Sequence, residues 1–260
     1  MSGPSEATSA EPHAVGFRSQ HAGQARAVVA FPPAGSDGRA FRPLASAFAA
    51  LAPETSFHAI DPPGRGRAAR TPPQDVRGFA ELAAPAVAQL LPEGSDIRLF
   101  GHSFGGYVAL EAARALLRSG AAPERLSLVL FASAPARQIA RLAEELDDEE
   151  RWPDRLRSLG GVPEQALASP FFRSLYLPAI RADLRAGRDY LLSAPSFAEL
   201  SDVEVVVAAA EEDVVVRPED MRSWLHSLPG ACFATLPCGH FPDEAALPAV
   251  VALLAPARLS

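Results

Sequence analysis

The chain has 260 residues, of which 48% are hydrophobic and 21% are charged, and its formal net charge at pH 7 is -7. This length suits one sizeable α/β domain, and the composition is ordinary for a globular protein. The acidic balance argues against nucleic-acid binding, which needs a basic surface. Two cysteines, Cys232 and Cys238, are too few for a disulfide framework and do not have zinc spacing, so we expect buried or half-buried thiols and no metal site.

Residues 1–24 are small, polar and without periodicity, which predicts a flexible lead-in to a single domain over 25–260. This segment contains no hydrophobic signal core, and no apolar run in the chain approaches the length of a membrane span. We therefore expect a cytoplasmic protein without a membrane anchor.

Apolar runs and helix-like stretches alternate along most of the chain. Strands are predicted at 25–31, 56–61, 96–101, 126–133, 203–210 and 232–237, and helices at 41–52, 79–91, 105–120 and 243–254. The runs at 126–133 and 203–210 are continuously apolar, as expected of parallel strands that are buried on both faces. The alternation predicts an α/β fold with a mostly parallel central sheet between layers of helices.

The stretch from about 136 to 200 breaks the alternation, because it is long, charged and helical, and contains no strand-like run. Segments of this length are usually lids or binding segments. Five apolar side chains in it fall on one helical face: Phe172, Leu175, Tyr176, Ile180 and Leu184. This face either packs on the core or covers a substrate channel, and the two interpretations are compatible.

The segment LFGHSFGGY, residues 99–107, places a serine in the pattern G-x-S-x-G between a predicted strand and a predicted helix. A sharp strand-to-helix turn of this kind strains the serine backbone and exposes its hydroxyl for attack. The start of the helix directs free N–H groups toward a developing oxyanion. Ser103 is therefore the predicted nucleophile, and Phe104 a predicted oxyanion donor.

A serine nucleophile needs a basic histidine, which in turn needs an orienting carboxylate. Where the serine lies on such a turn, the acid and then the histidine follow it along the chain. His226 and His240 follow Ser103, and His226 lies at a predicted helix end. His240 lies in a turn after the last predicted strand, at the edge of the sheet where ligands bind in open α/β folds. His240 is therefore the predicted base.

Carboxylates follow the predicted strand at 203–210, whereas the loop after 126–133 contains none. Among them we choose Asp213 as the acid, with Glu212 as the second choice. A further oxyanion donor is expected in the loop after the first strand. There Ala34 or Gly35 could donate, because the proline nitrogens before them carry no hydrogen.

With these residues placed, the chain resembles the type II thioesterases that accompany modular polyketide and nonribosomal peptide synthases. The similarity runs over about 25–255 and includes FPPAGSDGRAFRPLA, PPGRGRAA, GHSFGGYVALEAA, GGVPEQALASPFFRSLYLPAIRADLRAGRDY and PCGHF. It implies an α/β-hydrolase fold with a helical lid at about 136–200. It also implies a triad of Ser103, His240 and Asp213, with Ala34 and Phe104 forming the oxyanion hole.

The resemblance further implies hydrolysis of acyl groups from the phosphopantetheine thiol of carrier proteins, which releases aberrant or stalled chains. The implied partners are acyl or peptidyl carrier protein domains, with no cofactor, and we expect a monomer. Two other classes stay open. An acyltransferase of the same fold would use an acceptor other than water, although relatives of that kind tend to use cysteine as nucleophile. A non-catalytic carrier-binding module would be expected to lack a triad residue, and this chain lacks none.

Carrier proteins are generally acidic, so attraction to this acidic chain would need a local basic cluster. The candidates are the arginines of the lid region: Arg173, Arg181, Arg185 and Arg188. The alternative is an ordinary solvated helix face, on which arginines pair with Asp183 and Asp189.

Overall fold

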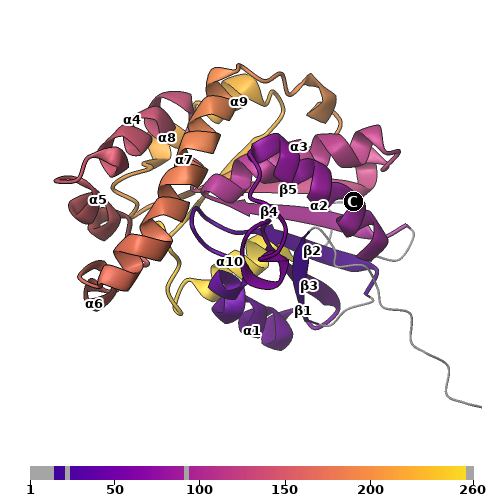
Figure 1. Ribbon diagram of the computed structural model, residues 1–260. Coiled ribbons are helices and arrows are strands. Elements are labelled where there is room, and N and C mark those ends of the chain that lie inside the picture. Colours follow the sequence, from indigo (N-terminus) through magenta and orange to yellow (C-terminus); the bar gives the residue numbers. More distant parts are fainter. Residues whose placement is uncertain (1–14, 21–23, 91–93, 256–260) are drawn as a thin grey trace, which may run out of the picture.

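The computed structural model describes residues 15–20, 24–90 and 94–255, and in this part of the chain a seven-stranded sheet forms the centre (Figure 1). The strand order is β1-β3-β2-β4-β5-β6-β7. The strands are β1 (Gly16–Gln20), β2 (Arg26–Phe31), β3 (Thr55–Asp61), β4 (Asp96–His102), β5 (Leu126–Phe131), β6 (Glu204–Ala210) and β7 (Cys232–Leu236). All neighbouring strands are parallel except β1 and β3, so the predicted mostly parallel sheet is confirmed.

The described residues also form ten α-helices, some of which cover the two faces of this sheet. They are α1 (Arg42–Leu51), α2 (Val76–Leu90), α3 (Phe104–Arg118), α4 (Ala136–Asp147), α5 (Trp152–Leu159), α6 (Glu164–Leu167), α7 (Leu177–Leu192), α8 (Pro218–Met221), α9 (Trp224–Ser227) and α10 (Leu247–Leu254). The apolar side chains of α2 and α3 pack in one core and those of α1 and α10 in another. Successive residues of β2 from Ala27 to Phe31 alternate between these two cores, which explains why this part of the strand is continuously apolar.

The first strand, β1, lies inside the segment that the sequence predicts to be a flexible lead-in, so that prediction is wrong for residues 16–20. β1 pairs antiparallel with β3 at the edge of the sheet, and Arg18 forms an ion pair with the buried carboxylate of Asp61. Five residues of mixed polarity give too short an alternation to predict a strand. Residues 1–14 and 21–23, which were part of the same prediction, lie outside the described residues.

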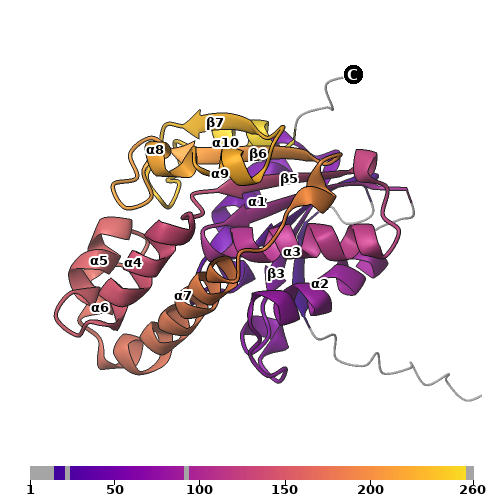
Figure 2. The same cartoon turned by 90° about the horizontal axis from the view of Figure 1, so that it is seen from above.

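The helices α4 to α7 are inserted between β5 and β6, where the sequence predicts a helical segment. In Figure 2, α4, α5 and α6 form a group, and α7 runs from this group toward α3. The approach of α7 to α3 is close, because a Cβ atom on Gly187 would lie 2.7 Å from the ring of Tyr107. That this insertion works as a lid stays a prediction.

The apolar face predicted for the insertion is only partly formed. Phe172, Ile180 and Leu184 are buried, whereas Leu175 and Tyr176 are 55% and 39% exposed. The five residues that precede α7 form a π-helical turn. Within this turn the rings of Phe172 and Tyr176 stack, with their centroids 5.9 Å apart. Three of the five side chains therefore pack in the core, and that this face covers a substrate channel stays a prediction.

Candidate active site

Ser103 lies between β4 and α3 with φ 55° and ψ -120°, a backbone conformation that is strained for a residue with a side chain. Two hydrogen bonds from the end of β5 hold it there. The N–H of Ser103 donates to the carbonyl of Phe131, and its own carbonyl accepts from the hydroxyl of Ser133, each at 2.8 Å. The neighbouring strand therefore fixes the sharp turn that the sequence pattern predicts.

The glycines around Ser103 are required by close packing. A Cβ atom on Gly105 would lie 2.1 Å from the carbonyl oxygen of Phe31, and one on Gly106 would lie 2.0 Å from the hydroxyl of Ser133. On Gly101 it would lie 2.4 Å from the Cα of Gly106. The G-x-S-x-G pattern thus reflects how tightly α3 packs onto the ends of β2, β4 and β5.

His240 and Asp213 form a buried pair in which Nδ1 of the imidazole lies 2.6 Å from Oδ2 of the carboxylate. The other oxygen of Asp213 accepts from the amides of Val215 and Val216, each at 2.9 Å. Burial alone would raise the pKa of Asp213, but the hydrogen bond and charge of His240 and these two amides outweigh burial and lower the pKa. The ionised carboxylate therefore accepts the Nδ1 proton, which leaves Nε2 of His240 free to accept another.

Glu212 is exposed, and its amide donates to the carbonyl of Cys238. Of the two carboxylates that the sequence left open, Asp213 is thus the one beside the imidazole. His226 is also exposed, on α9, and its ring lies near the carbonyl of Ser223. It takes no part in this cluster.

His102 joins His240 to the serine turn. Nε2 of His102 donates to the backbone carbonyl of His240 at 2.8 Å, and the two ring centroids are 5.3 Å apart. Burial, together with the neighbouring His240, lowers the pKa of His102 to about 3, so this ring is neutral at physiological pH. Because His102 directly precedes Ser103, the bond places the loop of His240 against the turn that carries the serine.

The two amides proposed for an oxyanion hole lie at the ends of β2 and β4. Phe104 is the first residue of α3, where helix N–H groups lack an intrahelical acceptor. In the turn after β2, the N–H of Gly35 donates to Asp183 at 2.7 Å and is therefore unavailable. Among the hydrogen bonds of the described residues, none occupies the N–H of Ala34. Ala34 is thus the better of the two candidates in this loop.

Three supporting residues were missed by sequence reasoning: Ser133, Arg65 and Asp183. Arg65 lies within the PPGRGRAA segment, which the sequence did single out as part of the resemblance. Asp183 was considered only as a partner for arginines on its own helix. No local pattern links it to Arg65, because the two residues are 118 positions apart in the chain.

The arginines of the insertion do not form an unpaired basic cluster. Arg181 and Arg173 both bind Glu149, Arg185 binds Asp147, and Arg188 binds Asp189. These contacts favour the ordinary solvated face. Of the two partners that the sequence suggested, Asp189 does pair with Arg188, whereas Asp183 does not contact these arginines and the others bind Glu149 and Asp147.

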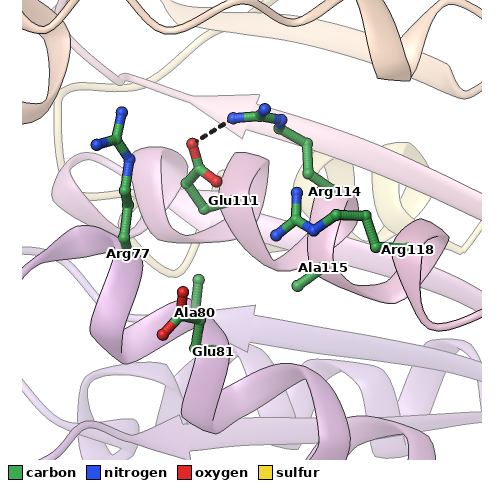
Figure 3. A pocket seen from close by; sticks show the side chains of 7 residues that line it. All are labelled: Arg77, Ala80, Glu81, Glu111, Arg114, Ala115 and Arg118. Atoms are coloured by element: carbon green, nitrogen blue, oxygen red, sulfur yellow. Dashed lines mark hydrogen bonds and ion pairs between the residues drawn. The ribbon is translucent and has the colours of Figure 1, made fainter.

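Two hollows in the described residues lie away from Ser103. One, of about 230 Å³, lies between α2 and α3 and is lined by Arg77, Ala80, Glu81, Glu111, Arg114, Ala115 and Arg118 (Figure 3). Its central carboxylate, Glu111, already accepts from Arg114 and from the hydroxyl of Tyr190 on α7. This network therefore connects α3 to α7. A larger cavity, of about 590 Å³, lies where the start of α4 and the end of α7 meet α8 and α9.

Neither cysteine is disulfide-bonded, and they differ in burial, since Cys238 is buried and Cys232 is exposed. The expectation of buried or half-buried thiols thus holds for Cys238 and is wrong for Cys232. Within the described ranges, no group of three or more histidine, cysteine, aspartate or glutamate side chains is arranged to hold a metal ion. No helix in the described part of the chain has the length and apolar character needed to cross a membrane.

Similarity to known proteins identifies the family to which the chain belongs. The sequence matches the family model described as "Thioesterase domain" over residues 26–255. The chain belongs to the thioesterase family. This confirms the resemblance predicted from the sequence. The serine turn and the buried His–Asp pair both lie within the matched thioesterase domain.

Similar proteins include thioesterase PikA5 of Streptomyces venezuelae, which is 34% identical over 180 residues. That match covers 68% of this chain and 62% of PikA5, slightly less than two thirds of the relative's length. The human medium-chain S-acyl fatty acid synthase thioesterase is 31% identical over 190 residues, covering 71% of this chain and 69% of the relative.

Among solved structures, the RedJ thioesterase from the prodiginine biosynthetic pathway of Streptomyces coelicolor superposes with a TM-score of 0.70 at 26% identity. The superposition covers 95% of this chain and 90% of RedJ. The similarity therefore includes the inserted helices as well as the sheet, and the α/β-hydrolase fold is confirmed.

Proposed function

We propose that this thioesterase hydrolyses acyl groups from the phosphopantetheine thiol of carrier proteins in a polyketide or nonribosomal peptide synthase system. The observation that carries the proposal is the buried His240–Asp213 pair, at 2.6 Å, bonded through His102 to the strained serine turn. Relatives named for the biosynthesis of cadicidin, gramicidin S and prodiginine support the choice of substrate. In this proposal the enzyme is a cytoplasmic monomer that needs no cofactor, and it removes aberrant or stalled chains.

Acylation would begin with attack of Ser103 Oγ on the thioester carbonyl, while Nε2 of His240 takes the hydroxyl proton. The charge that develops on the carbonyl oxygen would be held by the N–H groups of Ala34 and Phe104. When the tetrahedral intermediate collapses, the C–S bond breaks and His240 returns its proton to the departing thiol. The acyl group is then an ester of Ser103. Throughout, Asp213 stabilises the imidazolium and keeps the ring oriented.

Deacylation would repeat these steps with water as the nucleophile. His240 takes a proton from the water as it attacks the acyl ester, and the same two amides hold the second oxyanion. Collapse breaks the bond to Ser103 Oγ, which recovers its proton from His240. The products are a free carboxylic acid and a carrier with a free thiol.

The proposal is tested by incubating the protein with carriers loaded with a series of acyl groups, with and without added amine, alcohol and thiol acceptors, and weighing the products by mass spectrometry. Hydrolysis predicts the free acid as the main product even when acceptors are present. The Ser103→Ala variant should release none, whereas Ser46→Ala, an exposed serine on α1, should match the unaltered protein. Acyl groups found mainly on an added acceptor would identify a transferase. Carrier binding without release would indicate a binding module.

A further inference from the structure

Asp183 is a buried carboxylate in the middle of α7 that takes no part in the catalytic steps above. Its Oδ2 accepts from the amide of Gly35 at 2.7 Å and from Nη1 of Arg65 at 2.6 Å. Its Oδ1 accepts from Nη2 of Arg65 at 3.0 Å. One side chain thus joins α7 to the loop after β2 and to the loop after β3.

The turn that Asp183 holds is the one that presents Ala34. In this turn the amide of Ser36 donates to the carbonyl of Pro33 at 3.1 Å, and Gly35 has φ 73°. A Cβ atom on Gly35 would lie 2.2 Å from Cγ1 of Ile180, so α7 rests directly on this glycine. A glycine has no side chain that could anchor it, and its backbone is therefore fixed by this contact and by the bond to Asp183.

The charge of Asp183 is matched by Arg65. Burial raises the pKa of Asp183, and the charge and hydrogen bonds of Arg65, with the amide of Gly35, offset only part of this effect. A two-pronged arginine–carboxylate pair is geometrically specific as well as strong. When one partner of a buried pair is removed, the other is left with an uncompensated charge. Arg65 therefore holds the carboxylate of Asp183 in place as the acceptor for Gly35.

We propose that Asp183, held by Arg65, is a positioning residue that fixes the turn at Gly35 so that the adjacent amide of Ala34 faces the oxyanion. This inference rests on the proposed function, because it assigns a role within that reaction. The oxyanion hole is then complete only while α7 lies over the turn. Stabilisation of the tetrahedral intermediate therefore depends on the position of α7.

The test compares Asp183→Asn and Arg65→Gln with the unaltered enzyme on a small acyl-thiol substrate. Loss of one oxyanion donor lowers kcat by about 10²–10³. Because the amide would be misplaced and still present, we expect a fall of roughly 10–10² in kcat with little change in KM. A trifluoromethyl ketone analogue, which forms an oxyanion when Ser103 adds to it, should lose affinity by a similar factor. The matching thioether analogue, which forms no adduct, should bind as before.

The control is Asp147→Asn, which breaks the pair between α4 and Arg185 of α7, with N–O distances of 2.7 and 2.9 Å. It loosens the same helix away from the turn and should leave kcat unchanged on the small substrate.

Full kcat in both folded test variants would overturn the inference, as would an equal loss of affinity for ketone and thioether. The side chain of Arg65 is 21% exposed, so Arg65→Gln disturbs the core less than Asp183→Asn does. If Asp183→Asn does not fold, the kcat of Arg65→Gln alone tests the inference. Failure of both to fold would make the pair a stability element and also overturn the inference. An unaltered enzyme that hydrolyses no thioester would refute the proposed function itself.

Discussion

His102 Nε2 donates a hydrogen bond to the backbone carbonyl of His240 at 2.8 Å and so links the residue before the proposed nucleophile to the proposed base. His102 ends β4 and His240 lies in the loop after β7, and these two strands are separated in the sheet by β5 and β6. The loop after β7 must therefore return across the edge of the sheet. The bond to His102 fixes where it arrives.

Replacing His102 tests whether this bond matters for catalysis. In His102→Leu the carbonyl of His240 loses its buried donor, which costs about 1–3 kcal/mol, and the imidazole of His240 is free to shift. We expect kcat to fall roughly 10–10²-fold, since small misplacements of catalytic groups have effects of this size. His102→Gln, which keeps a donor, should recover part of the loss. An unchanged kcat in a folded His102→Leu protein would show that the loop is placed by other contacts.

Asp213 and Glu212 are adjacent in the chain and have opposite environments, so they form a matched pair for mutation. Asp213→Asn should keep the fold and lower kcat by about 10³–10⁴, because the imidazole loses its orienting charge. Glu212→Gln changes an exposed side chain and should have little effect. Steady-state kinetics on a small thioester decide between them. A larger loss for Glu212→Gln than for Asp213→Asn would contradict the geometry of the acid loop.

Much of this site could be predicted from the sequence because local patterns encode it. The glycines lie within three residues of Ser103 in the chain, so the motif shows them even though Gly105 and Gly106 pack against distant segments. His240 and Asp213 lie in the loops after two strands that are recognisable as apolar runs. The chain order of acid and base then limits the choice to a few residues.

Other features could not be predicted, because they depend on contacts between distant segments or on irregular backbone. The edge strand β1 is short and is stabilised by pairing with β3, which its own sequence does not show. The π-helical turn before α7 and the exposure of Leu175 within it also have no signal in the apolar spacing of the segment. The contacts of Asp183 with Arg65 and Gly35 join three separate segments, and the sequence carries no local signal for them.

The paired arginines of α7 predict that this face does not steer the carrier. Arg185 and Asp147 form a two-pronged pair, and removing both charges in Arg185→Gln/Asp147→Asn leaves the net charge of the face unchanged. Exposed pairs of this kind contribute little energy, so kcat/KM with an acyl carrier at low salt should change by less than about twofold. A large loss with the carrier, and none with a small acyl-thiol mimic, would restore the hypothesis of a basic docking cluster.

His58 predicts part of the dependence of stability on pH. It is buried on β3, where Nδ1 lies 2.8 Å from the hydroxyl of Ser19, and Nε2 has no partner among the described residues. Burial lowers the pKa of His58 to about 4, well below its ordinary value of 6.5. On acidification the unfolded chain therefore takes up this proton first. The free energy of unfolding should be at its full value above about pH 6.5 and fall as the pH approaches 4.

Urea unfolding at a series of pH values measures this contribution directly. One proton gained on unfolding corresponds to about 1.4 kcal/mol per pH unit, so the slope for His58→Gln should be shallower by about that amount between pH 6 and 4.5. His102 is present in both proteins, so its own contribution cancels in the comparison. Parallel slopes for the two proteins would show that His58 is not held neutral in the folded state.

The most direct test of the account is the site at which a serine-directed fluorophosphonate reacts. Trypsin cleaves after Arg98 and Arg114, and the peptide between these cuts, residues 99–114, contains one serine, Ser103. We expect a single adduct on this peptide, loss of thioester hydrolysis in proportion to labelling, and neither label nor turnover in Ser103→Ala. A label on another peptide, or full hydrolysis by Ser103→Ala, would contradict the assignment of Ser103 as the nucleophile.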